Sequence, residues 1–221
     1  MGYRLRDGLS WCVCAGRAVF LDLERDRYFC LRSPDDTAFR QLVSSPGHET
    51  DSSALARLER CGVLSLDAQA TVPIPTATAV PVRRDLAIET DGEARAIDLA
   101  RAIFAHRRAQ RAVKRQPLAE IVAALSIRAA DEASEAIAVS AELRRLSAAF
   151  ASSTLFLRKQ NNCLPRALAV RLLCRKAQIP AIVFGVRIEP FSAHCWAQWQ
   201  DMVIVGDLEV VRLFTPILVV R

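Results

Sequence analysis

A helix is predicted for Cys163-Leu164-Pro165-Arg166-Ala167-Leu168-Ala169-Val170-Arg171-Leu172-Leu173, and a cysteine begins it. A thiol at a helix N-terminus lies near the positive end of the backbone dipole, which favours the thiolate. His194 follows 31 positions later and Asp207 another 13 positions on, both in strand-like sequence. A histidine on an adjacent strand can accept the thiol proton, and a carboxylate on the next strand can fix the tautomer of the imidazole. This order of residues predicts a cysteine hydrolase or acyltransferase.

An antiparallel sheet is predicted next to this helix. Pro180 ends the helical pattern, and the apolar run Ala181–Val186 that follows has the length of a buried strand. More strand-like runs come after it, at residues 195–200, 202–205 and 217–220, with a hairpin turn at Gln200-Asp201. A nucleophile helix packed on strands that carry the base is the arrangement of papain and of transglutaminases. We therefore expect a papain/transglutaminase-like domain at residues 83–221.

Three helices are predicted between this domain's start and the nucleophile helix. Each has apolar residues three or four positions apart, the period of a helix with one buried face. They cover Gly92–Lys114 with Ile97, Ala100, Ile103 and Phe104, a segment from Pro117 with Ile121, Val122 and Leu125, and Asp131–Phe150 with Ile137, Leu143 and Leu146.

A separate small domain is predicted for residues 1–70. Short strands at residues 9–14, 17–23 and 27–31 are separated by tight turns, which is typical of a three-stranded meander. Ser33-Pro34 and Asp51 suit the beginnings of two helices, and Gly62 suits the end of the second. Residues 71–82 contain three prolines and no charge, so we expect a linker there. The predicted fold class is α+β.

Charge and hydropathy narrow the class of protein. The chain has 221 residues, 52% of them hydrophobic, and a formal net charge of +6. Basic residues gather at 101–115, which we interpret as a solvated helix face or a site for an acidic partner, because a nucleic-acid site would add a reading element or stacking aromatics. The chain opens without the pattern of a secretion signal, and no apolar run reaches the length of a membrane span. The cytoplasm is the expected compartment.

Seven cysteines, an odd number, exclude a complete disulfide framework. We interpret five of them as small buried apolar residues, namely Cys12, Cys14, Cys30, Cys61 and Cys174. A zinc site at Cys12 and Cys14 is the alternative, but a second pair of ligands at zinc-site spacing is missing. We expect neither a metal nor a cofactor.

The motifs around Cys163 and His194 resemble those of the transglutaminase-like peptidase of lasso-peptide biosynthesis. The resemblance covers about residues 155–218 and rests on the content and order of the runs at residues 162–169, 175–181, 185–187, 190–196, 205–207 and 214–217. It implies that Cys163 is the nucleophile, His194 the general base and later acid, and Asp207 the orienting carboxylate. A small residue often follows the histidine in that family. Cys195 stands there in this chain, and we interpret it as a packing substitution.

The sequence does not decide which group donates a hydrogen bond to the oxyanion. The backbone N–H of Cys163 is one expected donor, and a side-chain amide of Gln160, Asn161 or Asn162 could supply another. A helix cap is the alternative role for Asn161 and Asn162, because asparagine readily caps a helix N-terminus.

The first 68 residues resemble the PqqD-like element, a small winged-helix-like domain that recognises leader peptides of ribosomally made, modified peptides. Together the two resemblances imply a lasso-peptide B protein, which binds a precursor and cleaves off its leader to free a new amino terminus. The implied partners are the leader segment of the precursor and a separate, ATP-dependent, asparagine-synthetase-like cyclase, with no nucleic acid and no membrane. Leader binding by strand addition is expected on the third strand and the second helix, at Tyr28, Phe29, Leu31, Leu55 and Leu58. Core packing is the alternative role for Phe29 and Leu31.

Two other functions fit the same residues. One is a non-catalytic carrier that delivers the precursor to the cyclase, and the other is a thiol acyltransferase such as an amide crosslinker. Hydrolysis and transfer share an acyl-enzyme and differ only in whether water or an amine attacks it. Each site residue also has a structural alternative: Cys163 in a core, His194 as a satisfied buried histidine, and Asp207 as the cap of a turn.

Overall fold

The N-terminal part of the chain is built on a three-stranded meander. The computed structural model describes residues 2–44, 51–67, 79–89, 94–129, 139–153, 162–174 and 178–221. Strands β2 (Leu9–Cys14), β3 (Arg17–Asp22) and β4 (Arg27–Cys30) pair antiparallel in chain order, so β4 lies at an edge of this sheet. The turn between β2 and β3 is made at Ala15 and Gly16, both with positive φ, as a tight hairpin requires. The predicted meander is confirmed.

Two helices and a second, two-stranded sheet complete this part. They are α1 (Ser33–Ser44), α2 (Ser52–Arg60), and strands β1 (Gly2–Leu5) and β5 (Leu64–Asp67), which pair antiparallel. The predicted cap of α2 is confirmed, because Oδ1 of Asp51 accepts the backbone N–H of Ser53 at 2.9 Å. Gly62 follows the end of α2 with φ +69°, a conformation that disfavours residues with a side chain.

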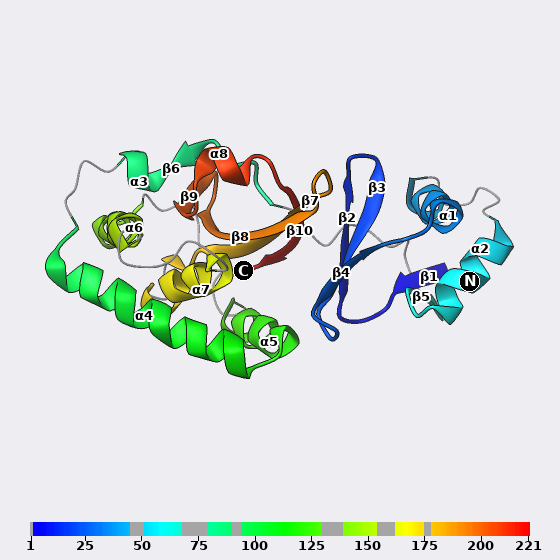
Figure 1. Ribbon diagram of the computed structural model, residues 1–221, viewed down its shortest axis with the longest axis horizontal. Helices are drawn as coiled ribbons and strands as arrows, with labels where there is room; N and C mark the ends of the chain where they lie inside the picture. Colours follow the sequence, from blue (N-terminus) through cyan, green and yellow to red (C-terminus); the bar gives the residue numbers. More distant parts are fainter. Residues whose placement is uncertain are drawn as a thin grey trace.

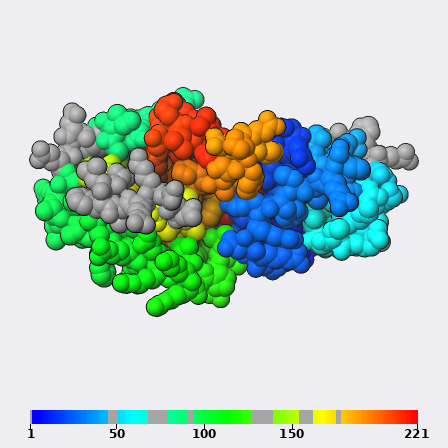
Figure 2. Space-filling view, viewed as in Figure 1, coloured from blue at the N-terminus to red at the C-terminus, as the bar shows by residue number. Residues whose placement is uncertain are grey.

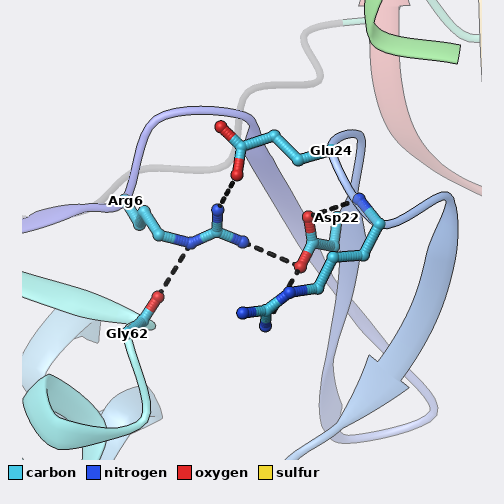
Figure 3. A network of polar contacts seen from close by, with 5 residues as sticks. Arg6, Asp22, Glu24 and Gly62 are labelled. Atoms are coloured by element: carbon cyan, nitrogen blue, oxygen red, sulfur yellow. Dashed lines mark hydrogen bonds and ion pairs between the residues drawn. The ribbon is translucent and has the colours of Figure 1, made fainter. Parts of the chain in front are cut away.

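Arg6 joins the two N-terminal sheets through three acceptors (Figure 3). Its Nε donates to the carbonyl of Gly62 at 3.0 Å, its Nη2 to Oδ2 of Asp22 at 2.7 Å, and its Nη1 to Glu24. Burial alone would raise the pKa of Asp22, but the hydrogen bonds and charge of Arg6 and Arg25 hold that pKa below its ordinary value. The side chain of Asp22 is only 1% exposed, so this network satisfies a buried carboxylate.

The C-terminal sheet has five strands in the order β10-β7-β8-β9-β6. Its members are β6 (Arg84–Asp85), β7 (Ala181–Arg187), β8 (Ser192–Trp199), β9 (Met202–Val205) and β10 (Thr215–Val220). The four long strands pair antiparallel as predicted, with the β8–β9 hairpin turning at Gln200, whose φ is +52°. The short edge strand β6 differs, because it runs parallel to β9. A strand that arrives from a distant part of the chain can join an edge in either direction, and local sequence does not decide which.

Helices pack against this sheet and against one another (Figure 1). They are α3 (Leu86–Glu89), α4 (Ala96–Arg115), α5 (Leu118–Ala129), α6 (Ala141–Ser153), α7 (Cys163–Leu173) and α8 (Leu208–Val211). The predicted inner faces of α5 and α6 are confirmed by the burial of Ile121, Val122, Leu143 and Leu146. Ile137 lies outside the described residues. In the part of the chain that the structure describes, no helix is both long and apolar enough to cross a membrane.

The predicted apolar face of α4 is wrong. Ile97 and Phe104 are 64% and 68% exposed, whereas Ala102, Ala105 and Ala109 are buried. Small residues let α4 approach α6 and α7 closely, so the alanines form the buried stripe and the larger apolar side chains lie outside it. The basic side chains predicted on this helix are exposed at Arg101, Arg107, Arg108, Arg111, Lys114 and Arg115.

The N-terminal meander and the C-terminal sheet share one hydrophobic core. Cys12, Cys14, Val19 and Leu21 of the meander pack in the same buried cluster as residues of β7, β8 and β10, and Sγ of Cys14 donates to the carbonyl of Val186 at 3.7 Å. Strand β2 lies against β10 (Figure 1), and Figure 2 shows the orange β7–β8 hairpin directly against the blue N-terminal strands. The predicted linker at 71–82 lies mostly outside the described residues, which begin again at Ala79.

Candidate active site

Cys163 is the first residue of α7 and is half-buried. The helical hydrogen bonds begin directly before it, where the N–H of Arg166 donates to the carbonyl of Asn162 at 3.0 Å. Pro165 is tolerated in this first turn, because the first backbone N–H groups of a helix have no partner within the helix. Ala167, Leu168 and the following apolar residues bury the inner face of α7 against β8 and α4. The packing therefore fixes the place of the thiol at the end of a buried helix.

His194 lies in β8, opposite Gly185 of β7. Its half-buried ring is 5.1 Å from the ring of Phe214 and 6.3 Å from that of Trp196, measured between ring centres. Burial lowers the pKa of His194, the positive charge of Arg166 lowers it further, and the negative charge of Asp207 acts against both. The imidazole is therefore neutral at pH 7, which is the form that can accept a proton.

Asp207 follows β9 and is the N-cap of α8. Its Oδ1 accepts the backbone N–H groups of Glu209 at 3.0 Å and Val210 at 3.3 Å. Gly206, before it, has φ +154°, and an added Cβ would lie 3.0 Å from a methyl group of Val203, so this turn favours glycine. The capping alternative is thus a real role of Asp207. A carboxylate has a second oxygen, however, and its charge already acts on His194.

The structure places Asp207 and Arg166 close enough to His194 for both charges to act on its imidazole, and it places Cys163 near Cys195, the next residue of β8. Arg166, one turn after Cys163, and Asp207 both act on the imidazole of His194. Among the described residues, no hydrogen bond joins the thiol, the imidazole and the carboxylate. Such bonds often shorten only when substrate binds. The triad of Cys163, His194 and Asp207 therefore stays a prediction.

The charge of Cys163 acts on two further side chains, Cys195 and Tyr28. Cys195 is buried, and burial raises the pKa of its thiol well above the ordinary value, with a further increase from the nearby Cys163. Tyr28 comes from the edge strand β4 of the N-terminal part. Its ring centre is 5.8 Å from that of Phe191, and the pKa of its hydroxyl is raised by burial and then by Cys195 and Cys163. Tyr28 of the N-terminal part therefore faces the same core as Cys163.

Sequence reasoning missed Arg166 as a site residue. It is half-buried on α7, where burial lowers the pKa of its guanidinium. Its Nη2 donates to the carbonyl of Phe150 at 3.0 Å. The cation is therefore held in place near His194. A basic residue within an apolar helix was the one signal in the sequence that could have indicated it.

Of the predicted oxyanion residues, the structure describes Asn162. This residue is the N-cap of α7, but its side chain makes no capping hydrogen bond. Its Oδ1 accepts instead from Nε2 of Gln110 in α4, at 2.9 Å. The capping alternative for Asn162 is therefore wrong. Gln160 and Asn161 lie outside the described residues.

The predicted leader-binding residues separate into two groups. Leu55 and Leu58 are 8% and 1% exposed and pack in the N-terminal core with Trp11, so their role in the structure is packing. Phe29 and Leu31 are half-buried at the edge of the same core. Tyr28 lies on the other face of the sheet, toward Cys163.

The remaining cysteines differ in environment. Cys12 and Cys14 are buried as predicted, and burial raises the pKa of Cys12 to about 12. Burial also raises the pKa of the half-buried Cys174 to about 12. Cys30 and Cys61 are exposed, so their predicted burial is wrong. Each lies at the end of its element, where the apolar period no longer faces the core. Within the described residues, no group of three or more His, Cys, Asp or Glu side chains could hold a metal ion.

Comparison with protein families gives one match. The model of the transglutaminase-like superfamily matches residues 103–219, which is more than half of the chain. The chain belongs to the transglutaminase-like superfamily. The matched region begins within α4 and ends within β10, and it includes the helix that begins at Cys163 and the strand that carries His194. Searches of curated proteins and of solved structures gave no significant match. Membership of this superfamily indicates cysteine-based peptidase or acyl-transfer chemistry in general.

Proposed function

We propose that the protein is a cysteine peptidase that removes the leader from a ribosomally made lasso-peptide precursor. One observation carries the proposal most: a half-exposed cysteine begins the buried helix α7 of a transglutaminase-like domain, and a neutral, half-buried histidine lies on the neighbouring strand. The lasso-peptide part rests on the sequence motifs around these two residues.

The chemistry proceeds through a thioester. His194 takes the proton of the Cys163 thiol, and the thiolate attacks the carbonyl carbon of the last leader residue. The tetrahedral intermediate then breaks its C–N bond, and the imidazolium of His194 gives its proton to the leaving amine. The core peptide departs with a free amino terminus. Water, deprotonated by His194, releases the leader as a carboxylate and restores the thiol.

Asp207 and Arg166 have opposite effects on His194. The carboxylate of Asp207 stabilises the imidazolium that forms during the reaction and, through its second oxygen, would orient the ring. The guanidinium of Arg166 disfavours the imidazolium and so keeps the resting imidazole neutral. The balance supports a base that is ready at neutral pH and becomes a strong acid once protonated.

The N-terminal part would recognise the leader as a PqqD-like, winged-helix-like element. In the described residues, strand β4 pairs on one side only, with β3, so an extended peptide could add to its other edge. Tyr28, on this strand, packs against the same core as Cys163, which supports delivery of a leader bound along β4 toward the proposed nucleophile. The released core peptide would pass to a separate ATP-dependent, asparagine-synthetase-like cyclase.

Mass spectrometry of a precursor peptide tests this proposal. A candidate precursor peptide is incubated with the wild-type chain and with Cys163→Ala. The wild type should give a leader fragment and a core fragment with a free amino terminus, and Cys163→Ala should give neither. The full-length Cys163→Ala chain should still bind the leader, which separates recognition from cleavage. Leader release by Cys163→Ala would show that the nucleophile is elsewhere.

Acyl transfer is the second candidate, because the superfamily covers both reactions. It uses the same thioester, with an amine in place of water as the attacking group. Incubation in water enriched in oxygen-18 distinguishes them, since hydrolysis adds the label to the leader carboxylate. A product that contains an amide crosslink and no label would favour the acyltransferase.

A further inference from the structure

Helix α4 contacts the beginning of the nucleophile helix through an amide pair. Nε2 of Gln110 donates to Oδ1 of Asn162 at 2.9 Å, across 52 positions of sequence. Asn162 directly precedes Cys163. The contact therefore links a residue far away in the chain to the residue next to the thiol.

The face of α4 that makes this contact is continuous. His106 and Gln110 are four positions apart and share a side of the helix with the buried Ala109. His106 is affected by the charge of Arg166, whereas Gln110 binds Asn162, and Asn162 and Arg166 are also four positions apart. The first turn of α7 thus lies along one side of α4, with the two helices in opposite directions.

Asn162 uses its side chain unlike a usual N-cap residue. An asparagine at this position normally turns its oxygen toward the free N–H groups of the first turn. Here Gln110 occupies Oδ1, and no capping hydrogen bond forms. Since the oxygen and nitrogen of an amide lie on different sides of its carbon, the bond to Gln110 fixes the direction of the Nδ2 donor end.

We propose that Gln110 is a positioning residue that holds Asn162 as an oxyanion donor beside Cys163. By accepting from Gln110, Oδ1 also polarises the amide, which strengthens Nδ2 as a donor. A fixed donor costs no reorganisation when the carbonyl oxygen becomes negative. This inference rests on the proposed thiol chemistry and would hold for a peptidase or an acyltransferase.

Two reagents for Cys163 separate this role from a merely structural one. Acetylation by p-nitrophenyl acetate passes through a tetrahedral oxyanion: the thiolate adds to the carbonyl carbon, and p-nitrophenolate leaves. Alkylation by iodoacetamide displaces iodide at a saturated carbon and forms no oxyanion. Peptide mapping by mass spectrometry follows both reactions at Cys163 itself, apart from the buried Cys195.

We expect Gln110→Leu to slow acetylation of Cys163 by about tenfold, less than the ~100-fold that loss of an oxyanion donor itself typically costs. Alkylation should stay within about twofold of the wild type, because the thiol keeps its place. In an Asn162→Ala background, Gln110→Leu should have no further effect, since the two residues act as one unit. Gln116→Leu is the matched control, because Gln116 is an exposed glutamine at the end of the same helix.

Three results would overturn the inference. Equal loss of acetylation and alkylation would mean that Gln110 only maintains the helix start. Unchanged acetylation would mean that the pair has no role, and a Gln110→Leu effect that persists without the Asn162 side chain would mean that it acts by another route. Failure of the proposed function gives a different result: wild-type Cys163 would then acetylate no faster than Cys163 in a His194→Ala chain.

Discussion

At the scale of single residues, the pKa of His194 is the property on which the proposed catalysis depends most. Burial and then the charge of Arg166 lower it, and Asp207 opposes them. A base must be neutral, so a lowered pKa extends the active pH range toward acid. In the proposed mechanism, the residues that surround the imidazole, rather than the histidine alone, would set the working pH.

Replacing Arg166 by methionine should raise the pKa of His194, because the cation that disfavours the imidazolium is removed. More of the imidazole is then protonated at a given acidic pH. The acid side of the pH profile of kcat/KM should therefore move to higher pH, while Arg166→Lys, which keeps the charge, should leave it close to the wild type. A shift to lower pH in Arg166→Met would contradict the assigned effect of the cation.

His106 offers a test of stability at the same scale. It is fully buried, and neither ring nitrogen has a hydrogen-bond partner among the described residues. Burial and Arg166 lower its pKa, so between the folded and unfolded pKa values the unfolded chain binds the proton and the folded chain does not. The folded protein therefore loses stability as the pH falls below about 6.5. The loss should be smaller in His106→Leu.

Thermal unfolding at pH 7.5 and pH 5.5 measures the effect. At pH 7.5 the free energy of unfolding of His106→Leu should be about 1 kcal/mol higher than that of the wild type. Leucine has a volume similar to that of histidine and lacks the two unsatisfied polar atoms. Its melting temperature should also fall less than that of the wild type between the two values. Identical pH dependence in both proteins would show that His106 has a partner in solution.

At the scale of elements, the pairing of β7 with β8 places His194 against Gly185. A Cβ at Gly185 would lie 2.7 Å from Cζ3 of Trp196 and 3.0 Å from Cβ of Phe214. These two rings flank His194. The absence of a side chain at Gly185 therefore allows the rings of Trp196 and Phe214 to pack on either side of the imidazole.

Gly185→Ala should destabilise the fold by about 2 kcal/mol through overpacking and lower kcat by roughly tenfold through displacement of the imidazole. The double variant Gly185→Ala with Trp196→Phe removes the atoms nearest the new methyl group and should recover most of the stability. Denaturant unfolding and steady-state kinetics measure the two effects. If Gly185→Ala has wild-type kinetics, the rings do not position His194.

The elements themselves could be predicted from the sequence where the signal is local. The meander, the cap at Asp51 and the hairpin at Gln200 depend on a few neighbouring residues, and all three are confirmed. The inner face of α4 could not be predicted, because which side of a helix is buried depends on the partner it meets. Close approach of α4 to α7 favours Ala105 over Phe104.

At the scale of the whole molecule, the candidate active site draws on parts that are far apart in sequence. The motifs predict Cys163 and His194 as site residues, and the family match covers both positions. The contact of Gln110 with Asn162 and the position of Tyr28 could not be predicted, since nothing in their local sequence indicates a contact across more than 50 positions. Tyr28 and Cys163 both pack against the core that the meander shares with the C-terminal sheet.

Tyr28→Ala should lower kcat/KM for precursor cleavage about tenfold, because it removes a ring that packs between the N-terminal part and the core around Cys163. Tyr28→Phe should stay near the wild type, since the ring and not the hydroxyl contacts Phe191. Arg25→Ala, on the exposed turn before β4, is the control for general effects on the N-terminal part. Equal kinetics for Tyr28→Ala and the wild type would place the substrate away from this ring.

Detection of a thioester on Cys163 is the most direct test of the proposed peptidase mechanism. The precursor is mixed with the wild-type chain, the reaction is stopped with acid within the first turnover, and the digested protein is mapped by mass spectrometry. The leader should be attached to the peptide that contains Cys163, should be released by hydroxylamine, and should be absent from His194→Ala. Cleavage of the precursor with no adduct on Cys163, together with an adduct on another residue, would contradict the assignment of the nucleophile.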